Sequence, residues 1–211
     1  MVQLPMLEAT PRKDTRERIL EVAEAAVMAK GFAATSIDEL IAAVGITKSG
    51  FFYHFKDKAE LAKAMMERYL VQDKAVLDGI FDRADELAED PLHGFLVALK
   101  MFAETMADLP VNYPGCLAAS FAYQDTLFSA DVCKMNADGL LGWRTRFRER
   151  LDRIAQKYPP KQDVDLDALA DMVTSLVEGG LILGRVLKDN TILPRQILLY
   201  RDFVRGIFAG N

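Results

Sequence analysis

The stretch from Ser36 to Leu61 reads SIDELIAAVGITKSGFFYHFKDKAEL and decides how the first part of the chain folds. Ser36 followed three residues later by Glu39 is a capping box, which marks the start of a helix. Gly45 marks its end, because glycine adopts the left-handed backbone of a helix C-terminus at little steric cost. Between them, apolar residues recur at the spacing of one helical face: Ile37, Leu40, Ile41 and Val44.

A second short helix is predicted from Lys48 to Phe55, with Thr47 as its N-cap. Two short helices joined by a glycine turn form a helix-turn-helix. The second helix gathers polar side chains of the kind that suits a DNA groove, namely Thr47, Lys48, Ser49, Tyr53 and His54.

The run from Gly45 to Lys58, closing on Glu60 and Leu61, resembles the DNA-binding signature of tetracycline-repressor (TetR) type regulators. The resemblance covers about residues 14 to 62 and departs at Phe52, where many members have tyrosine. For a chain of this type, Lys48, Ser49 and Tyr53 are the candidates for contact with base edges. The candidates for contact with the DNA backbone are Thr35, Thr47, His54 and Lys58. For Thr35, a plain helix-entry role is an equal alternative.

Composition agrees with a globular protein that reads DNA with one end. The chain has 211 residues, 51% of them apolar, and a net charge of −5. From Thr10 to Lys63, nine Lys/Arg stand against eight Asp/Glu, so the acidic excess lies further along the chain. Two cysteines without C-x-x-C spacing favour a reducing compartment. With neither a leader peptide nor an apolar run of ~18 residues, we expect a cytoplasmic protein without a membrane partner.

Helical periodicity continues to the C-terminus, and no strand-like alternation appears. The expected fold is therefore all-α: a three-helix helix-turn-helix head followed by a helical body for effector binding and dimerisation. We expect a flexible arm at residues 1–11, a DNA-binding domain at 12–57 and the body at 58–211. Further helices are predicted at Thr15–Lys30, Lys58–Leu87, Pro91–Pro110, Cys116–Phe128, Ala130–Tyr158, Asp165–Lys188 and Ile192–Ala209. The helix at Cys116–Phe128 is expected to be buried on all sides.

The last two helices carry narrow apolar seams. Ordinary packing within one chain explains such seams, and the resemblance implies instead a four-helix interface in a homodimer. The residues of the two seams are Leu176, Gly180, Leu183 and Leu187, and Ile197, Tyr200, Val204 and Ile207.

An effector pocket in the body is expected from a set of large apolar side chains, although such residues are more often plain core. The set is Phe102, Met106, Cys116, Phe121, Trp143 and Phe147, and the effector is expected to be largely apolar or electrophilic. Cys116 lies at a predicted helix N-terminus, where the dipole lowers a thiol pKa and would make a sensor of electrophiles. An inert core thiol with a raised pKa is the alternative.

Taken together, the residues favour a ligand-responsive regulator, with a repressor as the family's usual habit, that binds a palindromic DNA operator as a dimer. A helical adaptor that binds a protein partner is the alternative. An enzyme is not expected, because motifs for catalysis, a metal or a cofactor are missing: two histidines stand apart from any ligand cluster, and no phosphate-binding glycine loop occurs.

Overall fold

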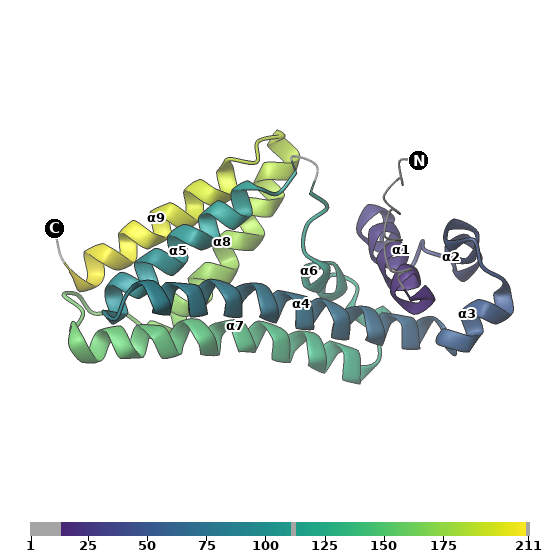
Figure 1. Ribbon diagram of the computed structural model, residues 1–211, viewed down its shortest axis with the longest axis horizontal. Coiled ribbons are helices and arrows are strands. Elements are labelled where there is room, and N and C mark those ends of the chain that lie inside the picture. The colour runs from purple at the N-terminus through teal and green to yellow at the C-terminus, as the bar shows by residue number, and fades with distance from the viewer. Residues whose placement is uncertain (1–13, 111–112, 210–211) are drawn as a thin grey trace, which may run out of the picture. The chain divides into compact units, whose positions relative to one another are not determined.

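A computed structural model describes residues 14–110 and 113–209. The predicted arm at residues 1–11 lies outside these ranges. Within them the chain forms α-helices and one 3₁₀ turn, and no strand (Figure 1). The helices divide into two compact units, a head and a body, between Met65 and Met66. The all-α prediction is confirmed, and no helix in the described ranges has the length and apolar content of a bilayer span.

The head consists of α1 (Thr15–Lys30), α2 (Ile37–Val44), α3 (Lys48–His54) and the first turns of α4 (Lys58–Leu87). Each helix contributes apolar side chains to one small core, in which Phe51 and Phe55 of the α3 region are almost fully buried. The other members are Ile19, Leu20, Ala23, Val27, Leu40, Val44 and Leu61. Because α3 is only two turns long, its position depends on these contacts rather than on its own helix propensity.

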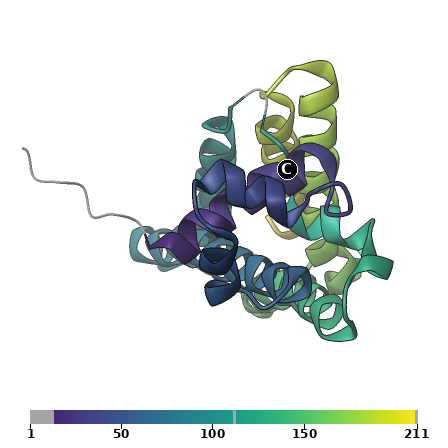
Figure 2. The same cartoon turned by 90° about the vertical axis from the view of Figure 1, so that its right-hand side faces the viewer.

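The body contains the rest of α4, α5 (Pro91–Ala107), α6 (Leu117–Ala122), the 3₁₀ turn η1 (Asp125–Leu127), α7 (Ala130–Lys157), α8 (Leu166–Leu187) and α9 (Ile192–Phe208). Within the body, α4 and α7 run side by side, and α5, α8 and α9 form a second layer (Figures 1 and 2). The main core lies between the layers and includes the aromatic rings of Phe81, Phe95, Phe102 and Phe147.

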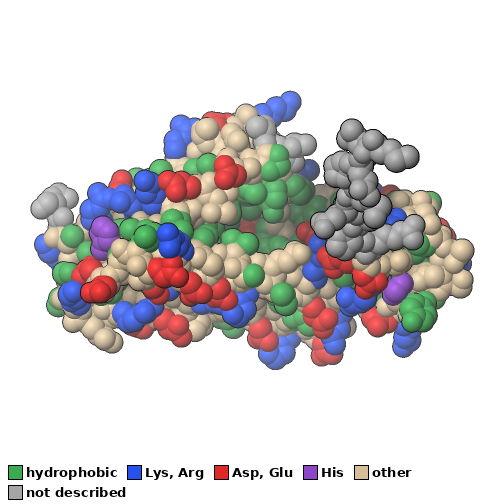
Figure 3. All heavy atoms as spheres, in the orientation of Figure 1, with side chains coloured by type: hydrophobic (Ala, Val, Ile, Leu, Met, Phe, Trp, Pro, Cys, Tyr) green, Lys and Arg blue, Asp and Glu red, His purple; other side chains and the backbone are tan. Residues whose placement is uncertain are grey.

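Aspartates of α4 form ion pairs with arginines of α7. Arg146 reaches Asp78 at 2.5 Å, and Arg150 binds Asp85 through two hydrogen bonds of 2.8 and 2.9 Å. Red and blue side chains accordingly alternate along this layer in Figure 3. Single exposed pairs contribute about 0–1 kcal/mol each. A row of them fixes the register of α4 against α7.

The predicted single helix at Cys116–Phe128 is wrong. α6 ends at Ala122, and Gln124 leaves helical backbone angles (φ −128°, ψ 28°) before η1 begins. The segment is not buried on all sides either, because Tyr123 and Leu127 are exposed. The fold thus leaves a short helix, a break and a turn lying against the start of α7.

The predicted dimer seam on α9 is also wrong. Ile197, Tyr200, Val204 and Ile207 are all at most 2% exposed within a single chain, so they have no surface to offer a second copy. They pack into the body core, as the intrachain alternative supposed. The same holds for two α8 positions. Gly180 is buried so closely against Leu193 that an added Cβ would lie 2.8 Å from its Cδ1, and Leu176 packs partly buried on the core. Leu183 and Leu187 are exposed, as an interface requires.

Candidate DNA interface and effector site

The turn between α2 and α3 is built from backbone hydrogen bonds around Gly45. Gly45 has a left-handed backbone (φ 73°, ψ 41°), and its N–H donates to the Ile41 carbonyl at 3.0 Å. Thr47 then caps α3, because its Oγ1 accepts from the Gly50 N–H at 3.1 Å. On the α1 side, Arg18 donates to the Val44 carbonyl at 2.7 Å and so caps the end of α2. Ser36 Oγ likewise accepts from the Glu39 N–H at 3.2 Å at the start of α2, so the predicted helix-turn-helix and both N-caps are confirmed.

The two faces of α3 differ sharply. Phe51 and Phe55 lie underneath with ring centroids 5.8 Å apart, and the Arg16 guanidinium covers the Phe55 ring. The opposite face carries Thr47, Lys48 and Ser49 in solvent and ends at Tyr53, which is 84% exposed. An exposed row of hydroxyls and an ammonium on a rigid helix can hydrogen-bond to base edges and phosphates.

Four of the seven predicted DNA-binding residues share this exposed face: Thr47, Lys48, Ser49 and Tyr53. Lys48 forms a solvent-exposed ion pair with Asp38 at 3.7 Å, which costs little to break. His54 is half-buried, with its ring edge-on to Tyr53. Phe52, where many members of the family have tyrosine, is 43% exposed and brings an apolar ring to the same surface.

Thr35 does not belong to this surface. Its side chain is 1% exposed and its Oγ1 donates to the Gly31 carbonyl at 3.0 Å. A phosphate contact by this side chain is therefore excluded in this conformation, and the helix-entry alternative is the one that fits.

Lys58 has a structural partner in place of the predicted phosphate. Its ammonium donates to the Phe32 carbonyl at 2.5 Å and lies 4.4 Å from the centroid of the Phe32 ring. Burial, followed by the nearby charge of Lys30, holds the pKa of Lys58 below its ordinary value. Lys58 thus ties the start of α4 to the loop after α1.

The aromatic residues predicted for the effector pocket separate into two groups. Phe102 and Phe147 are buried in the body core, where Phe147 contacts the rings of Phe81, Phe95 and Trp143 edge-on or stacked. Phe121 is buried at a different place, stacked on Phe128. These aromatic side chains fill space rather than line a common cavity.

Cys116 belongs instead to a cluster of polar groups inside the body. Its Sγ lies 3.1 Å from the Tyr69 hydroxyl and 3.5 Å from the Ala119 N–H. Burial, with the Glu178 carboxylate as the next cause, raises the pKa of Cys116 to about 12. Of the two alternatives, the inert core thiol with a raised pKa is the one that fits, because desolvation outweighs the hydrogen bond from the Ala119 N–H. A thiol with this pKa is almost wholly protonated at neutral pH and a poor nucleophile.

Sequence reasoning missed three members of this cluster, Tyr69, Asp73 and Glu178. Asp73 accepts a 2.6 Å hydrogen bond from the Trp143 indole, and burial raises the pKa of both carboxyl groups. A signal existed in the sequence, since Asp73 and Glu178 interrupt otherwise apolar helical faces. Together these groups offer carboxyl and hydroxyl oxygens within a partly buried space.

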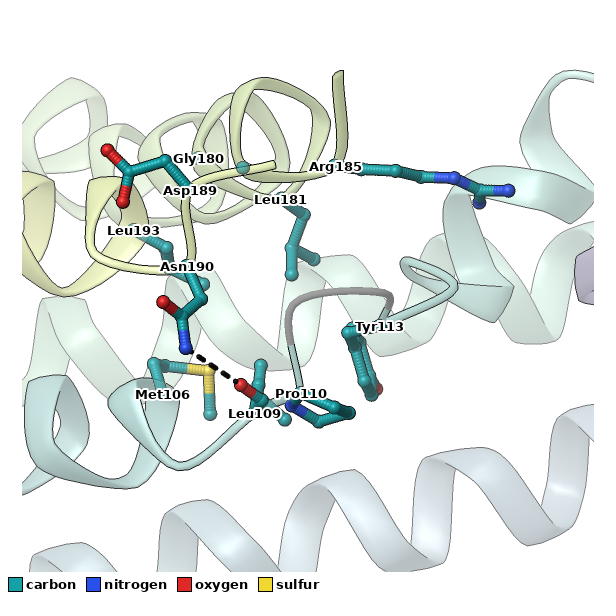
Figure 4. Close-up of a pocket in the computed structure, with 11 residues that line it drawn as sticks. Met106, Leu109, Pro110, Tyr113, Gly180, Leu181, Arg185, Asp189, Asn190 and Leu193 are labelled. Atoms are coloured by element: carbon teal, nitrogen blue, oxygen red, sulfur yellow. Dashed lines mark hydrogen bonds between the residues drawn. The ribbon is translucent and has the colours of Figure 1, made fainter. Parts of the chain in front are cut away.

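A small pocket lies between the end of α5 and the junction of α8 and α9 (Figure 4). Met106, Leu109 and Leu193 provide apolar walls, and Asn190 donates to the Leu109 carbonyl at 3.4 Å. Arg185 extends away from the pocket and donates to the Pro114 carbonyl at 2.5 Å. With a volume of about 30 Å³, this pocket holds about one or two water molecules and no drug-sized effector.

Comparison with known proteins agrees with this geometry. Residues 19–65 match the model of the bacterial regulatory proteins, tetR family. The HTH-type transcriptional regulator TtgR of Pseudomonas putida is 34% identical over 206 residues, which span 94% of this chain and 90% of TtgR. The chain belongs to the tetR family.

The fold of this tetR-family protein is shared with solved members. A TetR transcriptional regulator from Chloroflexus aurantiacus superposes with a TM-score of 0.75 at 23% identity, covering 92% of this chain and 96% of that one. Regulatory protein TetR from Rhodobacter sphaeroides gives 0.74 at 21% identity, covering 89% and 97%. The protein is thus a DNA-binding transcriptional regulator and not an enzyme.

Substitution of Lys48 and of Lys58 by methionine distinguishes a residue that contacts DNA from one that stabilises the fold. Lys48→Met is expected to weaken binding to a selected operator by about 1–3 kcal/mol and to leave the free energy of unfolding unchanged. Lys58→Met is expected to lower the free energy of unfolding by about 1–3 kcal/mol, because it removes a charged hydrogen bond to a part-buried carbonyl.

The salt dependence of DNA binding provides the second readout. Lys58→Met should keep the wild-type slope of log affinity against log salt, measured on folded protein by fluorescence anisotropy. A slope shallower by about 0.9 with unchanged stability would instead make Lys58 a phosphate contact.

Proposed function

We propose that the protein is a cytoplasmic repressor that binds a roughly palindromic DNA operator as a homodimer and is released by a small molecule. In this proposal residues 12–57 are the DNA-binding domain and residues 58–211 bind the effector and form the dimer. The observation that carries it is the exposed polar face of α3 on a buried aromatic base. Each subunit places one α3 in the major groove, with the two copies about one DNA turn apart.

Contacts to base edges are assigned to Lys48, Ser49 and Tyr53, since these are exposed polar side chains on α3. Thr47 and His54, at the two ends of α3, remain candidates for the DNA backbone. A helical adaptor needs no such face, and family membership speaks against it.

For the dimer, we propose the exposed apolar faces of α8 and α9 instead of the seams inferred from spacing. Soluble monomers rarely leave so many large apolar side chains together in solvent. The α8 face retains Leu183 and Leu187 from the sequence prediction. The full set is Ile182, Leu183, Val186 and Leu187 on α8, and Leu198, Leu199 and Phe203 on α9. The occupant is a second copy of this chain, because a palindromic operator requires twofold symmetry.

Leu183→Glu tests this interface. A charge placed there is expected to yield a folded monomer by analytical ultracentrifugation, and to reduce operator affinity at least tenfold because a single α3 remains to bind. Leu87→Glu is the matched control, since Leu87 is at least as exposed (55% against 46%) but lies at the end of α4. A dimer that persists in Leu183→Glu at micromolar concentration contradicts the assignment.

For the effector site, we propose the cluster of Tyr69, Asp73, Cys116, Trp143 and Glu178. Its members are contributed by α4, α7, α8 and the start of α6, so a ligand bound there would contact the helix that continues into the head. Two part-buried carboxyl groups favour a ligand with an amine or several N–H donors over an electrophile. Release requires that the ligand bind the DNA-free conformation more tightly than the DNA-bound one.

Tryptamine and tryptophol distinguish these ligand classes, because they share an indole and differ in an ammonium against a hydroxyl. Tryptamine is expected to raise the thermal midpoint more than tryptophol does in the wild type. In Glu178→Gln the difference should shrink, whereas Cys116→Ser should keep it. Equal midpoints with both compounds in the wild type would argue against a carboxylate-lined site.

A further inference from the structure

A second cleft opens on the body between α6, η1 and the first half of α7. It has a volume of about 240 Å³ and shares no residue with the cluster proposed for the effector. The cleft lies where the helix breaks at Gln124 and η1 follows, facing the first half of α7. The lining residues are Phe121, Ala122, Asp125, Phe128, Val132, Cys133, Asn136, Ala137 and Leu140.

Asn136 lies in the wall of this cleft, and its side-chain oxygen lacks a hydrogen-bond partner. It is 7% exposed, and its amide Nδ2 donates to the Ala118 carbonyl at 3.0 Å. Its Oδ1 has no hydrogen-bond partner, and no other buried side-chain oxygen or nitrogen of the described residues lacks one. Leaving a buried acceptor unpaired costs about 1–3 kcal/mol, and native proteins rarely do so without a reason.

Apart from Asp125 and Cys133, the other side chains of the wall are apolar. The rings of Phe121 and Phe128 stack with centroids 4.1 Å apart and an interplanar angle of 8°. Aromatic walls of this kind favour a planar aromatic guest. A cavity of roughly 150 Å³ accommodates benzene and drug-sized ligands need roughly 300 Å³ or more, so a volume between the two fits a bicyclic ring.

We propose that this cleft binds a small, neutral, planar aromatic compound with one hydroxyl or N–H donor, which pairs with Asn136 Oδ1. The donor requirement follows from the orphan acceptor, and the bicyclic size follows from the volume. A net negative charge is disfavoured, because Asp125 lines the same cleft.

Cys133 provides a built-in reporter of occupancy. It lies one helical turn before Asn136 and lines the cleft, with its Sγ 3.5 Å from the Asp125 carbonyl. Cys116 is the internal control, because its buried thiol with a pKa of about 12 should alkylate slowly whether or not the cleft is filled. Both free thiols can be followed in one digest by mass spectrometry.

The test compares 2-naphthol with 2-methoxynaphthalene, which has the same ring and no donor. On the full-length protein, 2-naphthol is expected to bind about 10- to 100-fold more tightly by fluorescence titration, as a hydrogen bond to a buried acceptor would provide. At saturation it should slow iodoacetamide modification of Cys133 at least fivefold and leave the rate at Cys116 unchanged.

Two variants locate the effect. Asn136→Leu should bind both compounds equally, since the acceptor is gone. Ala137→Phe should bind neither, because the added ring occupies the cleft from an exposed position on α7 and leaves Asn136 in place.

Equal affinity of the two compounds for the wild type would overturn the proposal, as would unprotected Cys133 at saturation. So would a crystal structure with 2-naphthol present that shows only a water on Asn136 Oδ1. None of these outcomes bears on operator binding or on the amine preference of the effector cluster, so this proposal and the proposed function fail separately.

Discussion

The left-handed backbone at Gly45 determines what α3 can present to DNA. It reverses the chain in one residue, after which Thr47 can cap α3 and Phe51 and Phe55 turn into the head. A residue with a Cβ in this conformation costs roughly 1–2 kcal/mol, although no neighbouring atom would obstruct it. The strain would come from the backbone itself. Everything exposed on α3 is exposed because this turn and these two rings hold the other face inward.

The body depends on a different feature, the long helix α7, which ion pairs hold against its neighbours. α7 binds α4 through Arg146 and Arg150, and it binds α8 through a bidentate pair between Arg144 and Asp171 at 2.6–2.7 Å. These contacts leave the interior to apolar rings and to the cluster around Cys116. A buried polar cluster is stabilising only where its groups find partners, which is why a ligand that supplies donors is expected there.

The helix boundaries of the head could be predicted from the sequence because the signals that set them are local. Ser36, Gly45 and Thr47 each act within four residues, and the structure confirms each one. Two contacts of the head were not predicted. The Lys58 ammonium reaches back 26 residues to the Phe32 carbonyl, and no spacing rule predicts such a contact. Thr35 Oγ1 donates to the Gly31 carbonyl only four residues back, which fits its helix-entry alternative.

In the body, periodicity predicted most helices to within a few residues but not which side of each helix faces outward. Tyr200 and Val204 recur at interface-like spacing and are core, while Leu199 and Phe203 beside them are exposed. An apolar helix in contact with neighbours on two sides has no unique inward face by sequence alone. The raised pKa of Cys116 was equally hidden, because it follows from burial beside Glu178, 62 positions away in the chain.

Selection of bound duplexes from a random DNA pool tests the central claim most directly. A dimer that reads DNA through two copies of α3 predicts enrichment of an inverted repeat with half-site centres about one helical turn apart, roughly 10 base pairs. Selection that enriches no common sequence, or a single half-site without its inverted partner, would contradict the account.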